Sequence, residues 1–217
     1  MRKIYQKAII MLSVACMGYA TPAFAADAIV KTNKAWLSGA THIYGRMTVS
    51  GITSSNIKEK GFCYSSVNQM PTVEDGTSKI YLSNQGEIYN ISQLKPATVY
   101  YIRAYVKKTN GDVVYGDPVK AITRPKGGVT YNINDGFPSD VLTRVQAAAK
   151  EAIDLWNEYT GIHGLHITIN YGAQTQTADC SYGGWMRIGP NASYQKTGTL
   201  LHEMLHAIGV GTHGTWQ

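Results

Sequence analysis

The sequence lacks a hydrophobic run long enough to cross a membrane. Its longest apolar stretch, residues 8–20, has about 13 residues, whereas a membrane-spanning helix needs about 20. This stretch follows a basic start and precedes the small residues of Ala23-Phe24-Ala25, an order typical of a secretory signal peptide over residues 1–25. We therefore expect a protein that is secreted, periplasmic or at the cell surface, with no integral membrane segment after signal cleavage.

The sequence also has little charge and no cluster of one sign. Charged residues make up 16% of the 217 residues, and the formal net charge is +6 at pH 7. The basic residues of the signal peptide, Arg2, Lys3 and Lys7, account for half of that excess, which leaves 17 basic against 14 acidic side chains. Because no Lys/Arg block or basic helical stripe remains, we expect no nucleic-acid partner.

Cysteine is scarce, since only Cys63 and Cys180 lie outside the signal peptide. An exported protein can form disulfides, but two cysteines this far apart, in what we interpret as different domains, are weak evidence for a bridge. We expect Cys63 to be a buried thiol, because alternation places it inward on a strand, and Cys180 to be more open. In an alternative interpretation one of these thiolates occupies the metal position described below, since thiolates bind zinc well.

Short alternating segments of apolar and polar residues fill the chain from about residue 28 to residue 124. Residues 42–49 and 99–106 are the clearest predicted strands, and turn-forming residues separate the segments. Asn110-Gly111, which lies between two apolar segments, predicts a hairpin with a two-residue primed turn. Nothing in this half predicts a helix. The pattern therefore favours an all-β sandwich.

One segment of this half carries a family resemblance. Residues 94–100, Leu-Lys-Pro-Ala-Thr-Val-Tyr, resemble the Leu-x-Pro-x-Thr-x-Tyr stretch that leads into a strand of fibronectin type III domains. The resemblance implies a fibronectin type III-like sandwich over residues 28–124, in which the Tyr100 hydroxyl bonds to the backbone a few residues upstream as a tyrosine corner. Because such sandwiches host many roles, we interpret this one as a spacer or docking module.

The pattern changes after residues 125–128, a short linker with one proline and two glycines. Over residues 140–159 the apolar residues recur at spacings of three and four, which predicts an amphipathic helix with Ser139 as its N-cap. Other segments predict three strands and a second helix, at residues 129–135, 165–170, 185–189 and about 195–208. The chain from residue 129 to residue 217 is therefore expected to be an α+β domain.

The second predicted helix carries the sequence His202-Glu203-Met204-Leu205-His206. Residues four apart lie on one face of a helix, so the imidazoles of His202 and His206 can bind one metal ion. Glu203 lies about 100° round the helix, beside a water on that ion. This spacing arises by chance about 0.005 times in a chain of this composition. It predicts a zinc site with a carboxylate base; the alternative is an amphipathic helix with solvated histidines.

Gly209 extends this pattern, and with it the C-terminal part resembles the zinc metallopeptidases of the metzincin clan. In that clan a glycine turns the chain after the second histidine, and a third histidine three residues later completes the zinc site. Here Thr212, a poor zinc ligand, stands at that position, and His213 follows it. Because a catalytic zinc generally holds three protein ligands and a water, we expect His213 to be the third ligand.

The sequence lacks a methionine after Met204, whereas the metzincin pattern implies a further subdomain with a methionine turn below the zinc. We therefore expect the metzincin-like domain over residues 129–217 to be incomplete, either as a fragment of a longer reading frame or as a truncated and inactive domain. Two earlier histidines do not replace what is missing. His163 falls in a predicted loop and His166 begins a predicted strand, so we interpret neither as a ligand.

Together these features predict a secreted zinc-dependent endopeptidase that hydrolyses peptide bonds. The resemblance implies Zn²⁺ held by His202, His206 and His213, with Glu203 as the general base that accepts a proton from the metal-activated water. The expected partner is a protein or peptide substrate, and export suggests an extracellular or host glycoprotein. The alternative is a non-catalytic exported binding or adhesion protein with an inactive peptidase-like domain, which bound zinc would distinguish from the enzyme.

Overall fold

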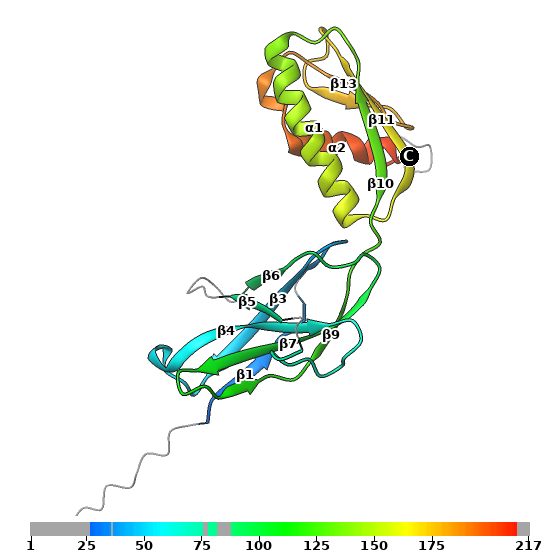
Figure 1. Cartoon of the computed structure of the whole chain (residues 1–217). Coiled ribbons are helices and arrows are strands. Elements are labelled where there is room, and N and C mark those ends of the chain that lie inside the picture. The colour runs from blue at the N-terminus through cyan, green and yellow to red at the C-terminus, as the bar shows by residue number, and fades with distance from the viewer. Residues whose placement is uncertain (1–26, 36, 76–77, 82–87, 212–217) are drawn as a thin grey trace, which may run out of the picture.

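A computed structural model of the chain describes residues 27–35, 37–75, 78–81 and 88–211. The predicted signal peptide and His213 lie outside these residues. The described chain forms two units in sequence order, each with its own hydrophobic core (Figure 1). The first is built from strands and the second from strands and two helices.

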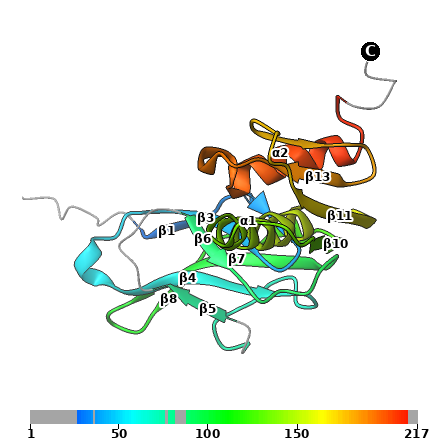
Figure 2. The same cartoon turned by 90° about the horizontal axis from the view of Figure 1, so that it is seen from above.

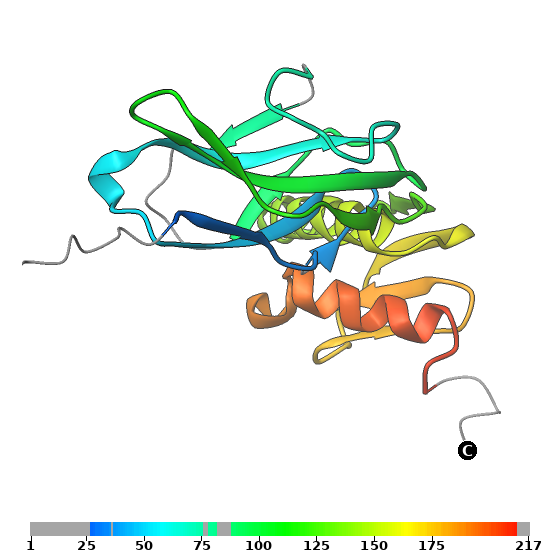
Figure 3. The same ribbon diagram turned by 90° about the horizontal axis from the view of Figure 1, so that it is seen from below.

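Two antiparallel sheets make up the N-terminal unit. In the first sheet, β3 (Ile43–Ser50) pairs with β1 (Ile29–Thr32), β2 (Leu37–Ser38) and β6 (Ile88–Ile91). The second sheet contains β5 (Ser78–Tyr81), β4 (Ile57–Ser65), β7 (Val99–Lys108), β8 (Val113–Tyr115) and β9 (Val119–Ile122). Views from above and below show the sheets as separate layers (Figures 2 and 3), which confirms the predicted β-sandwich.

Alternation along the strands builds the sandwich core. Ile43 from β3, Phe62 from β4 and Ile102 from β7 are all nearly inaccessible to solvent and meet between the two sheets. Tyr100 is buried at the start of β7, and its hydroxyl accepts a hydrogen bond of 2.9 Å from the Lys95 backbone N–H. The tyrosine corner expected from the sequence is therefore present.

The hairpin expected at Asn110-Gly111 joins β7 to β8, but its turn is longer than predicted. Four residues, 109–112, separate the strands, and Lys108 N–H donates to the Asp112 carbonyl at 2.8 Å. Gly111 has a positive φ of 98°, whereas Asn110 does not, so the two-residue primed turn was wrong. Local side-chain hydrogen bonds explain the longer turn. The Asn110 Nδ2 donates to the Asp112 carboxylate at 2.8 Å, and the Asn110 Oδ1 accepts from Asp112 N–H. A single helical turn, Ser54–Asn56, precedes β4.

The C-terminal unit is a four-stranded mixed sheet with two helices. Its strands run in the order β10 (Gly128–Ile133), β11 (His163–Tyr171), β13 (Trp185–Ile188) and β12 (Ala178–Cys180), and only β12 is antiparallel to its neighbour. Helix α1 (Ser139–Tyr159) joins β10 to β11, and α2 (Thr197–Ala207) follows β13 and the short turn Ala192–Tyr194. The predicted helices and three strands are confirmed, within a few residues at their ends.

Two details of this unit differ from the prediction. Helix α1 already includes Ser139 as its first residue, so Pro138 holds the N-cap position and no side chain caps the helix. Proline suits the start of a helix because its φ is fixed near the helical value. The prediction that Ser139 is the N-cap was therefore wrong. Strand β12 was not predicted, because three residues are too few to show alternation.

Both helices cover the same face of the sheet. Ile167 and Ile169 of β11, and Met186 of β13, are buried against Val145 of α1 and Met204 of α2 in one continuous core. Because successive strand residues point to opposite faces, the residues between these buried ones face the other way, into solvent. The sheet therefore has one covered face and one open face.

The two units meet at the C-terminal end of α1 (Figure 1). Glu158 accepts hydrogen bonds from the Thr41 backbone N–H at 2.7 Å and from His42 Nδ1 at 2.8 Å. His42 Nε2 in turn lies 2.9 Å from the Tyr159 hydroxyl. The linker is held as well, since Gly127 N–H donates to the Asn157 carbonyl at 2.7 Å. These contacts connect the sandwich to the helical side of the C-terminal unit.

Both cysteines of the described chain are free and buried. Cys63 is fully buried, as expected, but Cys180 is only 6% exposed, so the prediction that it is the more open of the two was wrong. Its strand position, opposite Met186, turns it toward α2. Within the described segments, neither helix is long and apolar enough to cross a membrane.

Candidate metal centre

Helix α2 places the predicted metal ligands at the edge of the C-terminal core. Leu200, Met204 and Ala207 recur at helical spacing and are buried in that core, which fixes the rotation of the helix about its axis. His202 is exposed and His206 half-buried on the adjoining face. Their ring centroids lie 5.0 Å apart with the planes at 86°, so the two imidazoles are neighbours as the four-residue spacing requires.

A backbone carbonyl sets the orientation of the His206 ring. Nδ1 of His206 lies 2.6 Å from the Val210 carbonyl oxygen, and a carbonyl can only accept, so Nδ1 carries the hydrogen. In the neutral imidazole the lone pair then resides on Nε2. Metal-binding histidines usually donate their other N–H in this way, to a carbonyl or carboxylate. Val210 was not predicted as part of the site, since a backbone carbonyl leaves no signal in a sequence.

The glycine after the second histidine ends the helix as expected. Gly209 has a φ of 102°, and two bonds close the helix end: Gly209 N–H donates to His206 and Val210 N–H to Leu205. This bonding pattern is a Schellman ending, in which the residue of positive φ is usually glycine. The following chain turns back on the helix. A Cβ placed on Gly211 would lie 3.6 Å from His206 Cε1, so the described chain reaches the ring before it ends.

Glu203 is the buried member of this group of three side chains. It is only 6% exposed to solvent. Desolvation by burial raises the pKa of Glu203 above its ordinary value, and the negative charge of Asp179 acts in the same direction, while His202 and His206 oppose it. A carboxylate with a raised pKa accepts a proton more readily, which suits a general base.

Cys180 lies close to Glu203 and was not predicted to do so. Burial raises the pKa of Cys180 to about 12, and the charges of Glu203 and Asp179 contribute. The thiol therefore keeps its proton at neutral pH, where a zinc ligand would be a thiolate. The alternative interpretation of Cys180 as a ligand gains no support from this arrangement. Cys63 lies on β4 of the sandwich, in the other unit, so this alternative gains no support for Cys63 either.

A cleft of about 350 Å³ runs beside the candidate centre. Its walls come from α2, from the segment that leads into α2 and from the start of β12: His202, Glu203, Thr199, Gly198, Lys196, Tyr194, Ala178 and Thr177. The cleft therefore exposes both Glu203 and His202 to the same space. A peptide lying there would pass the side chains that the sequence predicts to act on it.

The described residues supply two of the three expected metal ligands. His202 and His206 fit one ion, but within the described chain no group of three or more His, Cys, Asp or Glu side chains is assembled for a metal. The predicted third ligand, His213, lies outside the described residues, two positions beyond Gly211. His166 is not near this helix, because both its ring nitrogens bind Thr130 and Asn132 on the open face of the sheet.

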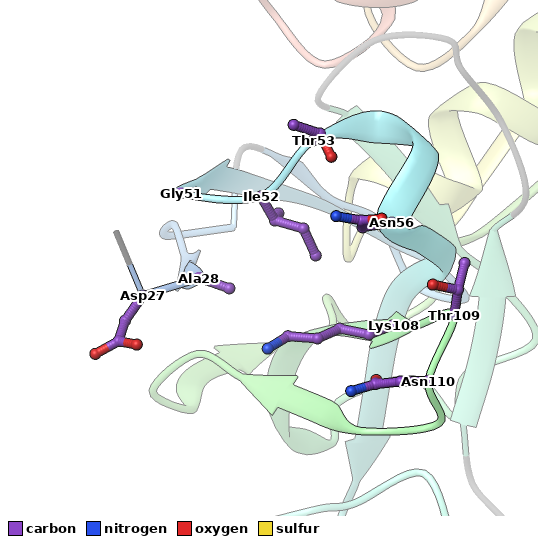
Figure 4. Close-up of a pocket in the computed structure, with 9 residues that line it drawn as sticks. All are labelled: Asp27, Ala28, Gly51, Ile52, Thr53, Asn56, Lys108, Thr109 and Asn110. Carbon is purple, nitrogen blue, oxygen red and sulfur yellow. The ribbon is translucent and has the colours of Figure 1, made fainter. Parts of the chain in front are cut away.

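A second hollow, of about 470 Å³, lies at the far end of the sandwich (Figure 4). Lys108 reaches into it between Ile52 and Asn110, and the rest of its wall is mainly small or amide residues. One ammonium group and one carboxylate, that of Asp27, do not by themselves make a catalytic arrangement. The cleft beside α2 is therefore the better candidate for a catalytic site.

Comparison with known proteins leaves the family open. No protein-family model matches the chain, and no curated protein matches it either. Among solved structures, it is similar to the sixth fibronectin type III domain of human fibronectin type III domain containing protein 3, at 22% identity over 50% of this chain and 88% of that one, with a TM-score of 0.32. A further fibronectin type III domain of that human protein matches at 14% identity over 45% and 85%, with a TM-score of 0.34.

A third similar structure is a Yersinia enterocolitica family 28 exopolygalacturonase, at 12% identity over 65% of this chain and 27% of that one, with a TM-score of 0.37. Scores this low do not align the two folds closely, and no residue role follows from them. The description of the N-terminal unit as a fibronectin type III-like sandwich rests on its own sheets and on the Tyr100 corner.

Proposed function

We propose that this protein is an exported zinc-dependent endopeptidase, with His202 and His206 as metal ligands and Glu203 as general base. The observation that supports it most is the arrangement of α2, where the imidazoles of His202 and His206 are neighbours, and His202 and the buried Glu203, a carboxylate of raised pKa, line one cleft. The Val210 carbonyl favours the His206 tautomer with its lone pair on Nε2, which is one of the two forms that can bind a metal. His213, beyond the turn at Gly211, is the candidate for the third ligand.

The chemistry divides between the metal and the protein. When bound, a zinc ion would lower the pKa of a coordinated water toward neutrality and would polarise a peptide carbonyl. Glu203 would take the proton from the attacking water and later deliver it to the leaving amine. Its burial matters for this role, because a fully solvated carboxylate of ordinary pKa would be a weaker base. The cleft wall from Ala178 to Thr199 would hold the peptide beside Glu203.

Substitution of Glu203 tests this assignment. Glu203→Gln keeps the size and burial of the side chain but removes the base, so cleavage of casein by the mature protein should fall by about 100-fold or more. The matched control is Glu74→Gln, an exposed glutamate on a turn of the sandwich, which should cleave at the wild-type rate. Release of casein peptides is measured with and without the chelator 1,10-phenanthroline.

Two results would reject the proposal. Cleavage by Glu203→Gln at the wild-type rate would exclude Glu203 as the base, and cleavage that the chelator does not inhibit would exclude a metal-dependent reaction. If wild-type protein neither binds zinc nor cleaves casein, the exported binding or adhesion protein becomes the better interpretation. That alternative places the function in the sandwich and leaves α2 without a catalytic role.

A further inference from the structure

The face of the C-terminal sheet that the helices leave uncovered has an unusual make-up. This open face consists of the outward-pointing residues of β10, β11, β12 and β13, which alternate with the buried ones. Asn132, His166 and Trp185 are exposed on it. It is distinct from the cleft beside α2, which lies on the covered side.

Hydrogen bonds between neighbouring side chains order one half of the open face. His166 Nε2 donates to Asn132 Oδ1 at 2.8 Å, and Asn132 Nδ2 donates to Asn134 Oδ1 at 2.7 Å. Asn134 Nδ2 then donates to Asn170 Oδ1 at 2.8 Å. Thr130 binds the other nitrogen of His166, also at 2.8 Å. Each amide keeps further donor or acceptor capacity for a ligand, and its orientation is already fixed.

Trp185 provides an apolar platform beside this network. Its side chain is 54% exposed, and the residue opposite it on β11 is the small Thr168, so one side of the indole is open to solvent. A hollow of about 400 Å³ adjoins the ring, with Ser181, Asp179 and Arg187 in its wall. Tryptophan combines a large apolar ring with a polar N–H, and it is enriched at binding interfaces for this reason.

The charge on the open face is balanced. Arg187 and Asp179 form a two-pronged pair, with Nε to Oδ1 at 2.9 Å and Nη2 to Oδ2 at 2.6 Å, so their charges largely cancel. The other side chains of the network are amides, a hydroxyl and a histidine that donates from Nε2. A phosphate-bearing ligand would need unpaired cations, and a protein partner would favour a wider apolar centre than a single indole.

From this combination we propose that the open face binds an uncharged glycan chain, with a sugar ring stacked on Trp185 and hydroxyl groups bound by Asn132, Asn170 and Asp179. Sugar hydroxyls each donate and accept, as amides do, and the apolar C–H face of a sugar ring matches an indole. The Arg187 pair holds the Asp179 carboxylate in place as an acceptor. This site is separate from the proposed peptidase centre and does not depend on it.

Affinity electrophoresis of the mature protein tests the site. Native gels contain hydroxyethylcellulose, galactomannan or arabinoxylan as uncharged polysaccharides. At least one should retard the wild-type protein, and Trp185→Ala should weaken the apparent affinity roughly tenfold or more, which corresponds to about 1.4 kcal/mol. Asn132→Ala, a second exposed position, should weaken it several-fold. The control is Leu155→Ala, a partly exposed apolar residue on α1 at the other side of the unit, which should migrate as the wild type does.

Several results would overturn the proposal. It is rejected if none of the three polysaccharides retards the wild type, or if Trp185→Ala and Asn132→Ala are both retarded as strongly as the wild type. It is also rejected if about 0.5 M NaCl abolishes retardation, since screening weakens contacts between exposed charges. A lower molecular mass of Trp185→Ala in solution would instead identify the open face as a contact between copies of this chain. Retardation that survives salt and is lost with Trp185 supports the glycan site.

Discussion

At the scale of single residues, burial is the largest cause of the raised pKa at three of the buried ionisable groups. Glu203, Cys63 and Cys180 all have raised pKa values for the same first reason, which is desolvation. For Glu203 the effect favours proton uptake in the cleft, whereas for the two thiols it suppresses reactivity. The same physical cause therefore serves a proposed catalytic role at one position and a structural role at the others.

Cys63 gives a pH-dependent prediction. Its Sγ lies 3.2 Å from the Pro71 carbonyl in a fully buried site, and burial raises its pKa from the ordinary 9.0 to about 11. The unfolded chain loses this proton above pH 9.0 while the folded chain keeps it. The resulting stability is therefore present below pH 9.0 and lost as the pH rises toward 11, by an amount on the order of 2–3 kcal/mol.

Urea unfolding at a series of pH values measures this loss. In Cys63→Ala the fall in unfolding free energy between pH 9.0 and 11 should be smaller than in the wild type. Alkaline titration of the tyrosines that Cys63 does not influence is common to both proteins and cancels in the comparison. Equal slopes in the two proteins would show that Cys63 titrates normally in the folded state.

At the scale of elements, α2 depends on how it ends. Gly209 has a φ of 102°, a region that costs an L-residue roughly 1–2 kcal/mol, so Gly209→Ala should destabilise the protein by about that amount. Gly198 of the same helix is the matched control. A Cβ at Gly198 would meet no atom within 4 Å, and alanine there should stabilise the helix by about 0.5–1 kcal/mol.

Urea denaturation followed by circular dichroism distinguishes the two substitutions. Opposite signs for Gly209→Ala and Gly198→Ala are expected, because one glycine is required by its backbone and the other is not. If both substitutions changed stability in the same direction, the positive φ at Gly209 would not be what ends the helix. Zinc binding should also weaken in Gly209→Ala, since the turn carries Val210 to His206.

Much of the element order could be predicted, and the failures have identifiable causes. Helix α1 and strands β3, β7 and β11 show periodic patterns over eight or more residues. That length is enough to distinguish the helical spacing of three and four from the alternation of a strand. Strand β12 has three residues and forms only because β13 is beside it. The burial of Cys180 follows from that pairing, so it could not be predicted either.

For the candidate site, the sequence could indicate the side chains but not their surroundings. The spacing of His202 and His206 follows from helix geometry alone, and so does the different direction of Glu203. The bond from His206 to the Val210 carbonyl, and the burial that raises the pKa of Glu203, depend on tertiary packing. The role of His213 stays a prediction, since that residue lies outside the described chain.

At the scale of the whole molecule, the contact between the two units depends on Glu158. Its carboxylate accepts from Thr41 N–H at 2.7 Å and from His42 at 2.8 Å, and its backbone carbonyl accepts from Ala40 N–H at 2.8 Å. Hydrogen bonds to a charged group are worth more than neutral ones, and only the carboxylate bonds disappear on substitution by alanine. The sandwich and the C-terminal unit should then separate more often.

Limited digestion with trypsin reports this separation. Glu158→Ala should be cut faster after the exposed Lys126, and a loss of about 1–2 kcal/mol corresponds to a roughly 5- to 30-fold larger open population. Asp154→Ala is the control, because Asp154 pairs with Lys150 on the surface of the same helix and contributes little. Mass spectrometry identifies the fragment that begins at Gly127. Equal cutting rates in both variants would mean that Glu158 does not hold the units together.

The measurement that tests the central claim most directly is the zinc content of the purified mature protein. Elemental analysis should find about one zinc ion per chain in the wild type and in Glu203→Gln, and less than about a tenth of that in His202→Ala, His206→Ala and His213→Ala. Retention in Glu203→Gln is expected because Glu203 is proposed as the general base and not as a metal ligand. A wild-type protein without zinc, or full zinc content in His206→Ala, would contradict the metal centre on α2.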